Sequence, residues 1–206
     1  MFDLTKKYID ENIMTVINIL TRTGKRPNYY KALKDSINLQ SYENIRHIKS
    51  CDNPSCSYLE NEPDVISVTP NKKAGRAFYN LYLNDLGQIP TEGWVIILDD
   101  DSKMIDASFI EKLAKLCEKS KETDVLIYKA KIYKDRILPK DVHFQNKTFM
   151  NGDIDMACFC VHHSVFSVFK FKSEVCGDYN FLNLIRNSNK YNFRYVDLPI
   201  GIWANY

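Results

Sequence analysis

Short apolar runs alternate with amphipathic segments over the first two thirds of the chain. The runs rich in β-branched and other apolar residues predict buried strands, and they cover residues 13–20, 45–50, 64–68, 94–98 and 124–128. Apolar residues at helical spacing predict helices over residues 28–40, 73–86 and 107–119. This alternation indicates an α/β fold whose sheet has parallel strands at its centre.

The pattern changes near residue 130. Residues 134–155 are mostly polar, and an apolar run at 156–161 predicts a further buried strand. We expect a helix over residues 178–189 and a strand over 193–196. We therefore predict a single compact domain over residues 1–206, made of two halves that meet near residue 130.

Composition and charge narrow the class of protein. The chain has 206 residues, 45% of them hydrophobic, and a net charge of +2, which is ordinary for a globular domain and too balanced for a DNA-coating protein. We expect no nucleic-acid partner. The apolar runs are too short to span a membrane, and the charged N-terminus lacks the apolar core of a signal peptide. These features predict a soluble, cytoplasmic protein.

The six cysteines do not form the dense pattern of a disulfide scaffold. Cys51 and Cys56 are spaced too loosely for a zinc knuckle, and the sequence has no second cysteine pair that would supply the other two zinc ligands. We therefore expect reduced thiols in or near the core.

The strongest chemical signal is the acidic triplet Asp99, Asp100 and Asp101, which directly follows the most apolar predicted strand. Open α/β sheets bind ligands at the carboxyl ends of their strands. Adjacent carboxylates repel one another, and a hard cation such as Mn²⁺ or Mg²⁺ relieves that repulsion. Asp106 is better placed to cap the next helix, so capping does not explain the triplet. A solvated acidic turn remains an alternative.

Cationic residues follow other predicted elements. Thr21, Arg22, Thr23 and Arg26 come at or after the end of the first strand, where a cationic loop suits a diphosphate, although a solvated loop is an equal alternative. Residues 71–76 open the predicted helix at 73–86. Its backbone N–H groups, backed by cationic side chains, suit phosphate or a sugar hydroxyl. The candidates in this segment are Lys73, Gly75 and Arg76.

The second half offers two candidate general bases, Asp155 and Asp178. Each has a structural alternative, because Asp178 follows a glycine as an N-cap does and Asp155 precedes a strand as a turn residue does. His162 and His163 are either a further metal ligand or structural.

These residues together resemble a known family. A first strand ending in Thr21-Arg22-Thr23, a second ending near Asp52 and a third running into Asp99-Asp100-Asp101 resemble the family 2-type glycosyltransferases of the GT-A fold. The similarity covers roughly residues 13–190 and looks closest to small glycosyltransferase domains of large DNA viruses. It implies a Rossmann-like three-layer sandwich with a mostly parallel central sheet.

The resemblance also implies roles for residues. Asp101, with Asp99, would hold Mn²⁺ or Mg²⁺ on a nucleotide diphosphate, and Asp99 or Asp100 would reach the ribose or a metal-bound water. Thr21, Arg22 and Asp52 would line the base and ribose, and Asp178 lies where such enzymes place the catalytic base. Residues 13–130 would bind the nucleotide-sugar and residues 131–206 the acceptor.

The implied activity is metal-dependent transfer of a sugar from a nucleotide diphosphate donor, with a UDP-sugar favoured, to a hydroxyl of a glycan or glycoprotein, with inversion. A viral origin would place the protein in the host cytoplasm or with the virion. Residues 75–80 lack the usual Ala-Arg-Asn ending, and the chain stops at Tyr206 before the later acceptor elements of longer relatives.

Other classes remain as alternatives. A sugar-nucleotide nucleotidyltransferase shares the architecture, but it would place a glycine-rich loop after the first strand, where only Gly24 stands. A metal-dependent nuclease or phosphohydrolase would need more carboxylates and a more basic groove. A non-catalytic carbohydrate-binding relative would keep the fold without turnover.

Overall fold

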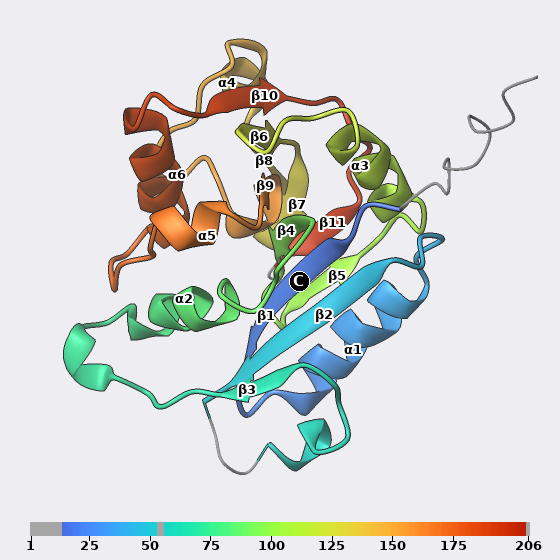
Figure 1. Ribbon diagram of the computed structural model, residues 1–206, viewed down its shortest axis with the longest axis vertical. Helices are drawn as coiled ribbons and strands as arrows, with labels where there is room; N and C mark the ends of the chain where they lie inside the picture. The colour runs from blue at the N-terminus through green and yellow to red at the C-terminus, as the bar shows by residue number, and fades with distance from the viewer. Residues whose placement is uncertain (1–13, 53–55, 205–206) are drawn as a thin grey trace, which may run out of the picture.

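The computed structural model describes residues 14–52 and 56–204, and its centre is a seven-stranded sheet in the order β10-β6-β9-β4-β1-β2-β3 (Figure 1). The strands are β1 (Ile17–Thr23), β2 (Ile45–Cys51), β3 (Val65–Ser67), β4 (Trp94–Ile97), β6 (Asp124–Ile127), β9 (Phe159–His162) and β10 (Asn192–Tyr195). Only β9 runs antiparallel to its neighbours, β4 and β6. The predicted α/β class with a mostly parallel sheet is confirmed.

A second, four-stranded sheet has the order β5-β11-β7-β8. Its strands are β5 (Ser102–Met104), β7 (Ala130–Ile132), β8 (Arg136–Leu138) and β11 (Ile202–Ala204). Because β5 follows the aspartate triplet directly, this sheet anchors the chain on the far side of the triplet. Residues 134–155, which the sequence indicated only as a polar stretch, contain β8 and a short helix, α4 (Asp141–Gln145).

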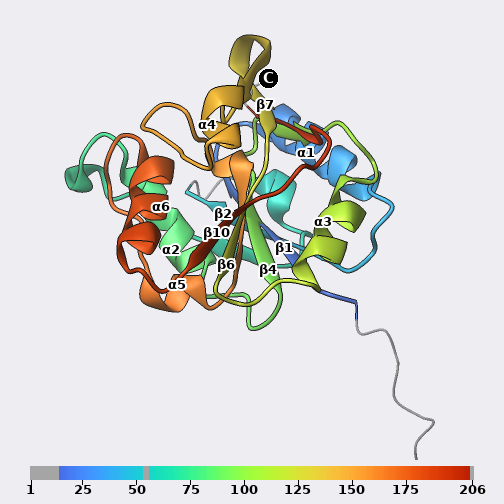
Figure 2. The ribbon, with the colours of Figure 1, turned by 90° about the horizontal axis from the view of Figure 1, so that it is seen from above.

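Helices cover both faces of the main sheet. Figure 2 shows α1 (Pro27–Asn38) and α3 (Phe109–Cys117) on one side, with α2 (Tyr82–Leu86), α5 (Val165–Val168) and α6 (Gly177–Asn187) on the other. The layers sandwich strands whose residues are apolar on both faces, as central parallel strands require. No helix in the described part of the chain is long and apolar enough to cross a membrane.

The central strands β1, β4 and β6 are buried along their whole length. Asn18 is the one polar residue within the first half of β1, and its side-chain amide donates to the carbonyls of Glu92 (2.9 Å) and Trp94 (3.2 Å). A buried amide with both bonds made costs little, so Asn18 ties β1 to the start of β4.

Two predicted elements differ from the structure. The first strand was predicted at residues 13–20, but β1 continues through Thr23 because it pairs with β2 up to the Thr23–Cys51 register; Ile13 lies outside the described residues. The helix predicted at residues 73–86 is broken into the 3-10 turns Lys72–Ala74 and Phe78–Leu81 followed by α2. Gly75 has φ +108°, a conformation that a continuous helix does not contain.

The expectation of reduced cysteines is wrong for one pair, since Cys51 and Cys56 form a disulfide. Cys51 ends β2 and Cys56 directly precedes the 3-10 turn Ser57–Leu59, and their Cα atoms lie 6.7 Å apart. Sequence spacing alone did not reveal this pairing. The remaining cysteines are free, and Cys117, Cys158 and Cys160 are buried as expected.

We expect the disulfide to stabilise the fold. Cys56→Ser should lower the free energy of unfolding by about 2 kcal/mol, because the crosslink no longer restricts the unfolded chain. Urea denaturation under oxidising conditions measures the change, and Cys176→Ser, which removes a free cysteine, is the control. Dithiothreitol should destabilise the wild type and leave Cys56→Ser unchanged, and equal effects on both would contradict the expectation.

Candidate active site

The carboxyl ends of β1, β2 and β4 meet at one edge of the sheet, where they border a cavity of about 720 Å³. Its walls come from the β1 end and the loop after it, the β2 end, Asp99 and Asp101, and the segment before α2. Asp100, which was also expected to reach a ligand, is fully buried and does not line the cavity. The lining residues are Arg22, Thr23, Gly24, Lys25, Arg26, Asp52, Pro70, Lys72, Phe78, Tyr79, Tyr82, Asp99 and Asp101. This is the edge where the sequence predicted a ligand site.

Arg22 and Asp99 form a paired arrangement at the floor of the cavity. The Arg22 Nε and Nη2 donate to the two carboxylate oxygens of Asp99 at 2.7 and 2.5 Å. The Arg22 side chain is 10% exposed, so its charge is almost fully removed from water. A bidentate guanidinium–carboxylate pair suits such a position because it satisfies both planar groups at once.

Asn80 continues this arrangement into the second half of the chain. Its side-chain oxygen accepts from Arg22 Nη1 at 2.7 Å, and its amide donates to the Glu174 carbonyl at 2.9 Å. Gly177 packs so closely against Asn80 that an added Cβ would lie 2.4 Å from the amide nitrogen. Glycine at 177 therefore lets the start of α6 approach the Arg22 network.

Asp100 and Asp101 share another cation, Arg26. Asp100 is completely buried; its carboxylate accepts from the Thr23 hydroxyl at 2.8 Å and forms an ion pair with Arg26. Asp101 is 20% exposed and pairs with Arg26 Nη1 at 3.0 Å. Burial raises the pKa of Asp100 to about 6 and raises that of Asp101, against the lowering effect of Arg26.

The donor set fits a divalent cation carried by a phosphate ligand. Asp101 Oδ1 is buried without a hydrogen-bond partner, and Asp101 lines the cavity. Within residues 14–52 and 56–204 no group of three or more acidic, histidine or cysteine side chains is arranged to hold a metal. Mg²⁺ typically takes only one or two carboxylates when phosphates complete its shell, so Asp101 would suffice as a protein ligand.

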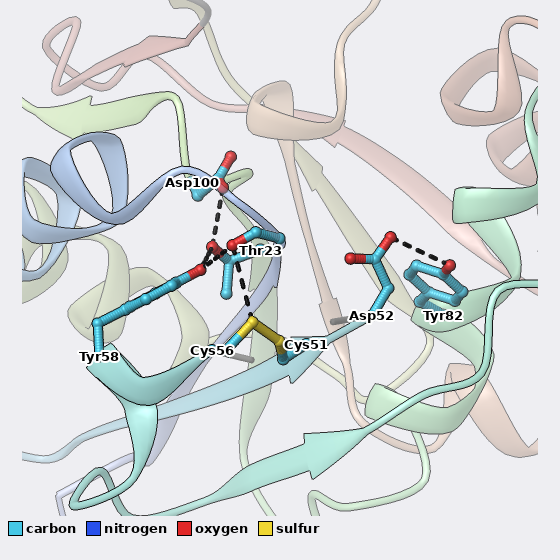
Figure 3. The surroundings of a disulfide bond; sticks show 8 residues. Thr23, Cys51, Asp52, Cys56, Tyr58, Tyr82 and Asp100 are labelled. Atoms are coloured by element: carbon cyan, nitrogen blue, oxygen red, sulfur yellow. Dashed lines mark hydrogen bonds between the residues drawn. A yellow bond between two sulfur atoms is a disulfide. The ribbon is translucent and has the colours of Figure 1, made fainter. Parts of the chain in front are cut away.

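Asp52 forms the opposite wall. Its carboxylate lies 3.4 Å from the Tyr82 hydroxyl, and a Cβ on Gly24 would come within 2.9 Å of it (Figure 3). Burial raises the pKa of Tyr82 to about 12, so this hydroxyl stays protonated as a donor. Asp52 follows Cys51 directly, so the disulfide lies beside this wall.

Tyr58 supports the loop between β1 and α1. Its hydroxyl donates to the Gly24 carbonyl and lies 2.9 Å from the Thr23 hydroxyl, which in turn donates to Asp100 (Figure 3). The neighbouring Cys56 Sγ is 3.7 Å from the same carbonyl. The disulfide segment thus contacts the loop that carries Arg26.

A second, smaller cleft of about 210 Å³ adjoins the first. It is lined by Arg22, Tyr79, Asn80, Asp99, Asp155, Met156, Glu174, Val175, Cys176, Gly177 and Asp178. The two clefts share Arg22, Tyr79 and Asp99. A ligand in the first cleft can therefore present one end to the second.

Asp155 and Asp178 both face the second cleft. Asp155 Oδ1 accepts from the Ala157 N–H at 2.9 Å, and Asp178 Oδ1 accepts from the Tyr179 N–H at 2.7 Å. Burial raises the pKa of Asp155 to about 6, and burial also raises the pKa of Asp178. Asp178 lies in the first turn of α6 and Cys176 is the N-cap, so Asp178 does not serve as the cap.

Several other predicted residues lie elsewhere. Thr21 is buried with its hydroxyl 2.9 Å from His47 Nε2, and it does not line the cavity. Lys73, Gly75 and Arg76 are exposed, and Lys72 takes the position in the cavity wall that was expected of them. The helix start that was predicted to present them is a single 3-10 turn.

The histidine pair lies at the opposite edge of the sheet. Because β9 is antiparallel, His162 pairs with Trp94 at the start of β4, whereas the aspartates follow its end. The same antiparallel direction places Asp155, which precedes β9, at the same edge of the sheet as the aspartate triplet.

Asp106 was expected to cap the helix that follows it. The N-cap residue of α3 is instead Ser108, and the Asp106 carboxylate accepts from the Ser108 N–H at 2.8 Å in the turn before the helix.

Sequence reasoning missed the aromatic wall. The Tyr79 ring packs against the Arg22 guanidinium at 5.0 Å and borders both clefts, and Phe78 and Tyr82 continue the wall of the larger one. All three residues lie in the segment that the sequence predicted as a continuous helix over residues 73–86. The glycine at 75, which breaks that helix, was the available signal.

The fold is similar to solved structures of TarS from S. aureus. The structure of TarS gives a TM-score of 0.70 at 13% identity and covers 93% of this chain and 37% of TarS. TarS 1–349 in complex with UDP gives 0.71 at 12% identity, covering 93% and 60% of the two chains. The complex with UDP-GlcNAc gives 0.66 at 11%, covering 93% and 58%.

At these identities the similarity establishes the fold, which is the GT-A fold that the sequence predicted. The chain spans less than two thirds of the length of these relatives. No protein-family model and no curated protein matches the sequence. The viral resemblance and the division into two halves at residue 130 stay predictions.

We expect the Arg22–Asp99 pair to be important for stability. Asp99→Asn should lower the free energy of unfolding by about 2 kcal/mol, because it leaves a buried guanidinium with a weaker partner. Asp101→Asn, which changes a carboxylate whose partner Arg26 is half-exposed, should stay within about 0.5 kcal/mol of the wild type. Urea denaturation of the ligand-free protein compares the two, and equal losses would contradict the ranking.

Proposed function

We propose that the protein transfers a sugar from a nucleotide diphosphate donor, with a UDP-sugar favoured, to a hydroxyl acceptor. The observation that carries the proposal is the pair of joined clefts, one walled by Asp52, Asp99 and Asp101 and the other by the half-buried carboxylates Asp155 and Asp178. The structural neighbours are glycosyltransferases, and TarS 1–349 has been solved with UDP and with UDP-GlcNAc.

The donor lies across the larger cleft. Its base and ribose lie toward Asp52 and the aromatic wall, and its diphosphate lies toward the triplet and the cationic side chains Arg22, Arg26 and Lys72. Guanidinium groups bind phosphate oxygens in a bidentate manner. This orientation directs the anomeric carbon to the junction at Arg22, Tyr79 and Asp99, next to the second cleft.

Asp101, with Asp99, would hold Mn²⁺ or Mg²⁺ on the diphosphate. When bound, the cation neutralises the diphosphate and makes it a better leaving group. Arg22 lies beside this position, and Asp99 and Asn80 fix its orientation. Its guanidinium stays charged across the physiological pH range, but that charge is paired with Asp99.

Asp178 is the proposed general base. The acceptor hydroxyl oxygen attacks the anomeric carbon and its proton passes to the Asp178 carboxylate, while the bond to the diphosphate oxygen breaks and its electron pair leaves with the diphosphate. Attack opposite the leaving group inverts the anomeric centre. Asp178 is favoured over Asp155 because it lies at the start of α6, where the helix dipole stabilises the carboxylate form.

We expect UDP to bind together with a divalent cation. UDP with Mn²⁺ should raise the melting temperature by about 5 °C or more at a hundredfold excess over Kd, and UDP alone should raise it less. Asp101→Ala should lose the metal-dependent part of this shift and most sugar transfer. Full activity of Asp101→Ala would exclude the metal site, and binding of UDP-sugar without turnover would indicate a non-catalytic relative.

The base assignment predicts a dependence on pH. Asp178→Asn should lower kcat by about a hundredfold or more while leaving UDP affinity unchanged, because a lost general base affects the transfer step. Since burial raises the pKa of Asp178, wild-type kcat/KM should fall as pH decreases through that raised value. Steady-state kinetics from pH 4.5 to 8, spanning about the ordinary carboxylate range and above, measure both. Full activity of Asp178→Asn would move the base to Asp155.

A further inference from the structure

Arg26 already neutralises the carboxylates to which we assign the cation. It comes from the loop after β1, and its guanidinium pairs with Asp100 on one side and with Asp101 on the other. Its side chain is 47% exposed, whereas Asp100 is fully buried beneath it. Arg26 is therefore a half-exposed side chain over a largely buried acidic pair.

Arg22, the other arginine at the site, is not available to neutralise Asp100 and Asp101. Both carboxylate oxygens of Asp99 and the guanidinium of Arg22 are engaged with each other, and Asn80 holds Arg22 from a third side. In the described part of the chain, Arg26 is the cation that forms ion pairs with Asp100 and Asp101. Without it, two adjacent and largely buried carboxylates would face each other uncompensated.

We propose that Arg26 is a tethered placeholder for the divalent cation, and this inference rests on the proposed function. In the nucleotide-free protein Arg26 occupies the acidic pair and keeps free metal ions out. When the metal–diphosphate arrives, the guanidinium exchanges carboxylate oxygens for phosphate oxygens, which it binds equally well. The metal is then retained only together with the nucleotide.

Charge explains this coupling. The triplet with Arg22 and Arg26 carries a net charge of about −1 when all carboxylates are ionised, which attracts a lone divalent cation weakly. Removal of Arg26 leaves about −2 and exposes the oxygens of Asp101 for coordination. The diphosphate instead adds negative charge and gives Arg26 a new partner, so metal and nucleotide assist each other.

Isothermal titration with Mn²⁺ alone tests the placeholder. Arg26→Gln should bind Mn²⁺ at least tenfold more tightly than the wild type in the absence of nucleotide. Lys25→Gln is the matched control, because Lys25 lines the same cavity and is exposed, and in the described residues no ion pair joins it to the triplet. We expect its Mn²⁺ affinity to stay within about twofold of the wild type.

Two further titrations locate the effect. The double variant Arg26→Gln with Asp101→Asn should lose the gain, and with UDP present the gap between wild type and Arg26→Gln should shrink or reverse. Arg26→Gln binding Mn²⁺ no more tightly than the wild type, or a gain that survives Asp101→Asn, would overturn the placeholder.

The proposed function fails by a different result. If the wild type neither binds UDP nor transfers sugar while Arg26→Gln still gains Mn²⁺ affinity, the placeholder stands as a property of the acidic pair and the transferase assignment falls. If the wild type transfers sugar with metal and Arg26→Gln shows no gain, only the placeholder falls. Melting curves of the variants confirm that each is folded.

Discussion

The buried contact of Arg22 with Asp99 and Asn80 joins the parts of this fold that must act together. Arg22 comes from β1, Asp99 from the end of β4 and Asn80 from the segment before α2. Asn80 also bonds the Glu174 carbonyl and packs on Gly177. One guanidinium thus aligns two strand ends with the start of the helix that carries Asp178. A charge so deeply buried is tolerated only when its donors are satisfied, so these contacts constrain one another.

The charges around this contact are distributed by depth. Asp99 and Arg22 neutralise each other at the floor, Asp100 is held from below by Thr23, and the more exposed Arg26 lies above Asp100 and Asp101. The disulfide and Tyr58 support the loop that carries Arg26. Arg22 and Asp99 are engaged with each other, whereas Arg26 is half-exposed. We therefore expect stability and cation binding to depend mainly on different members of one acidic triplet.

Hydrophobic pattern predicted the fold well because central parallel strands are apolar on both faces, and β4 and β6 were found nearly to the residue. The positions of Asp52 and the triplet in the site followed from the rule that strand ends gather at one edge. The disulfide, the break at Gly75 and the aromatic wall of Tyr79 were not predictable in this way. Each depends on where a loop turns, and no periodicity records a turn.

The direction of β9 explains why, of the candidates before and after this strand, Asp155 lies at the site and the histidines do not. With β9 antiparallel, the residues before it lie at the active edge and the residues after it lie at the far edge. Asp155 is thereby brought to the second cleft, while His162 packs beside Trp94 at the start of β4 and is removed from the triplet. Sequence alone offered both as candidates, since a buried run looks the same in either direction. A single reversed strand thus decides that Asp155, and neither histidine, lies with Asp178 of α6 in the wall of the second cleft.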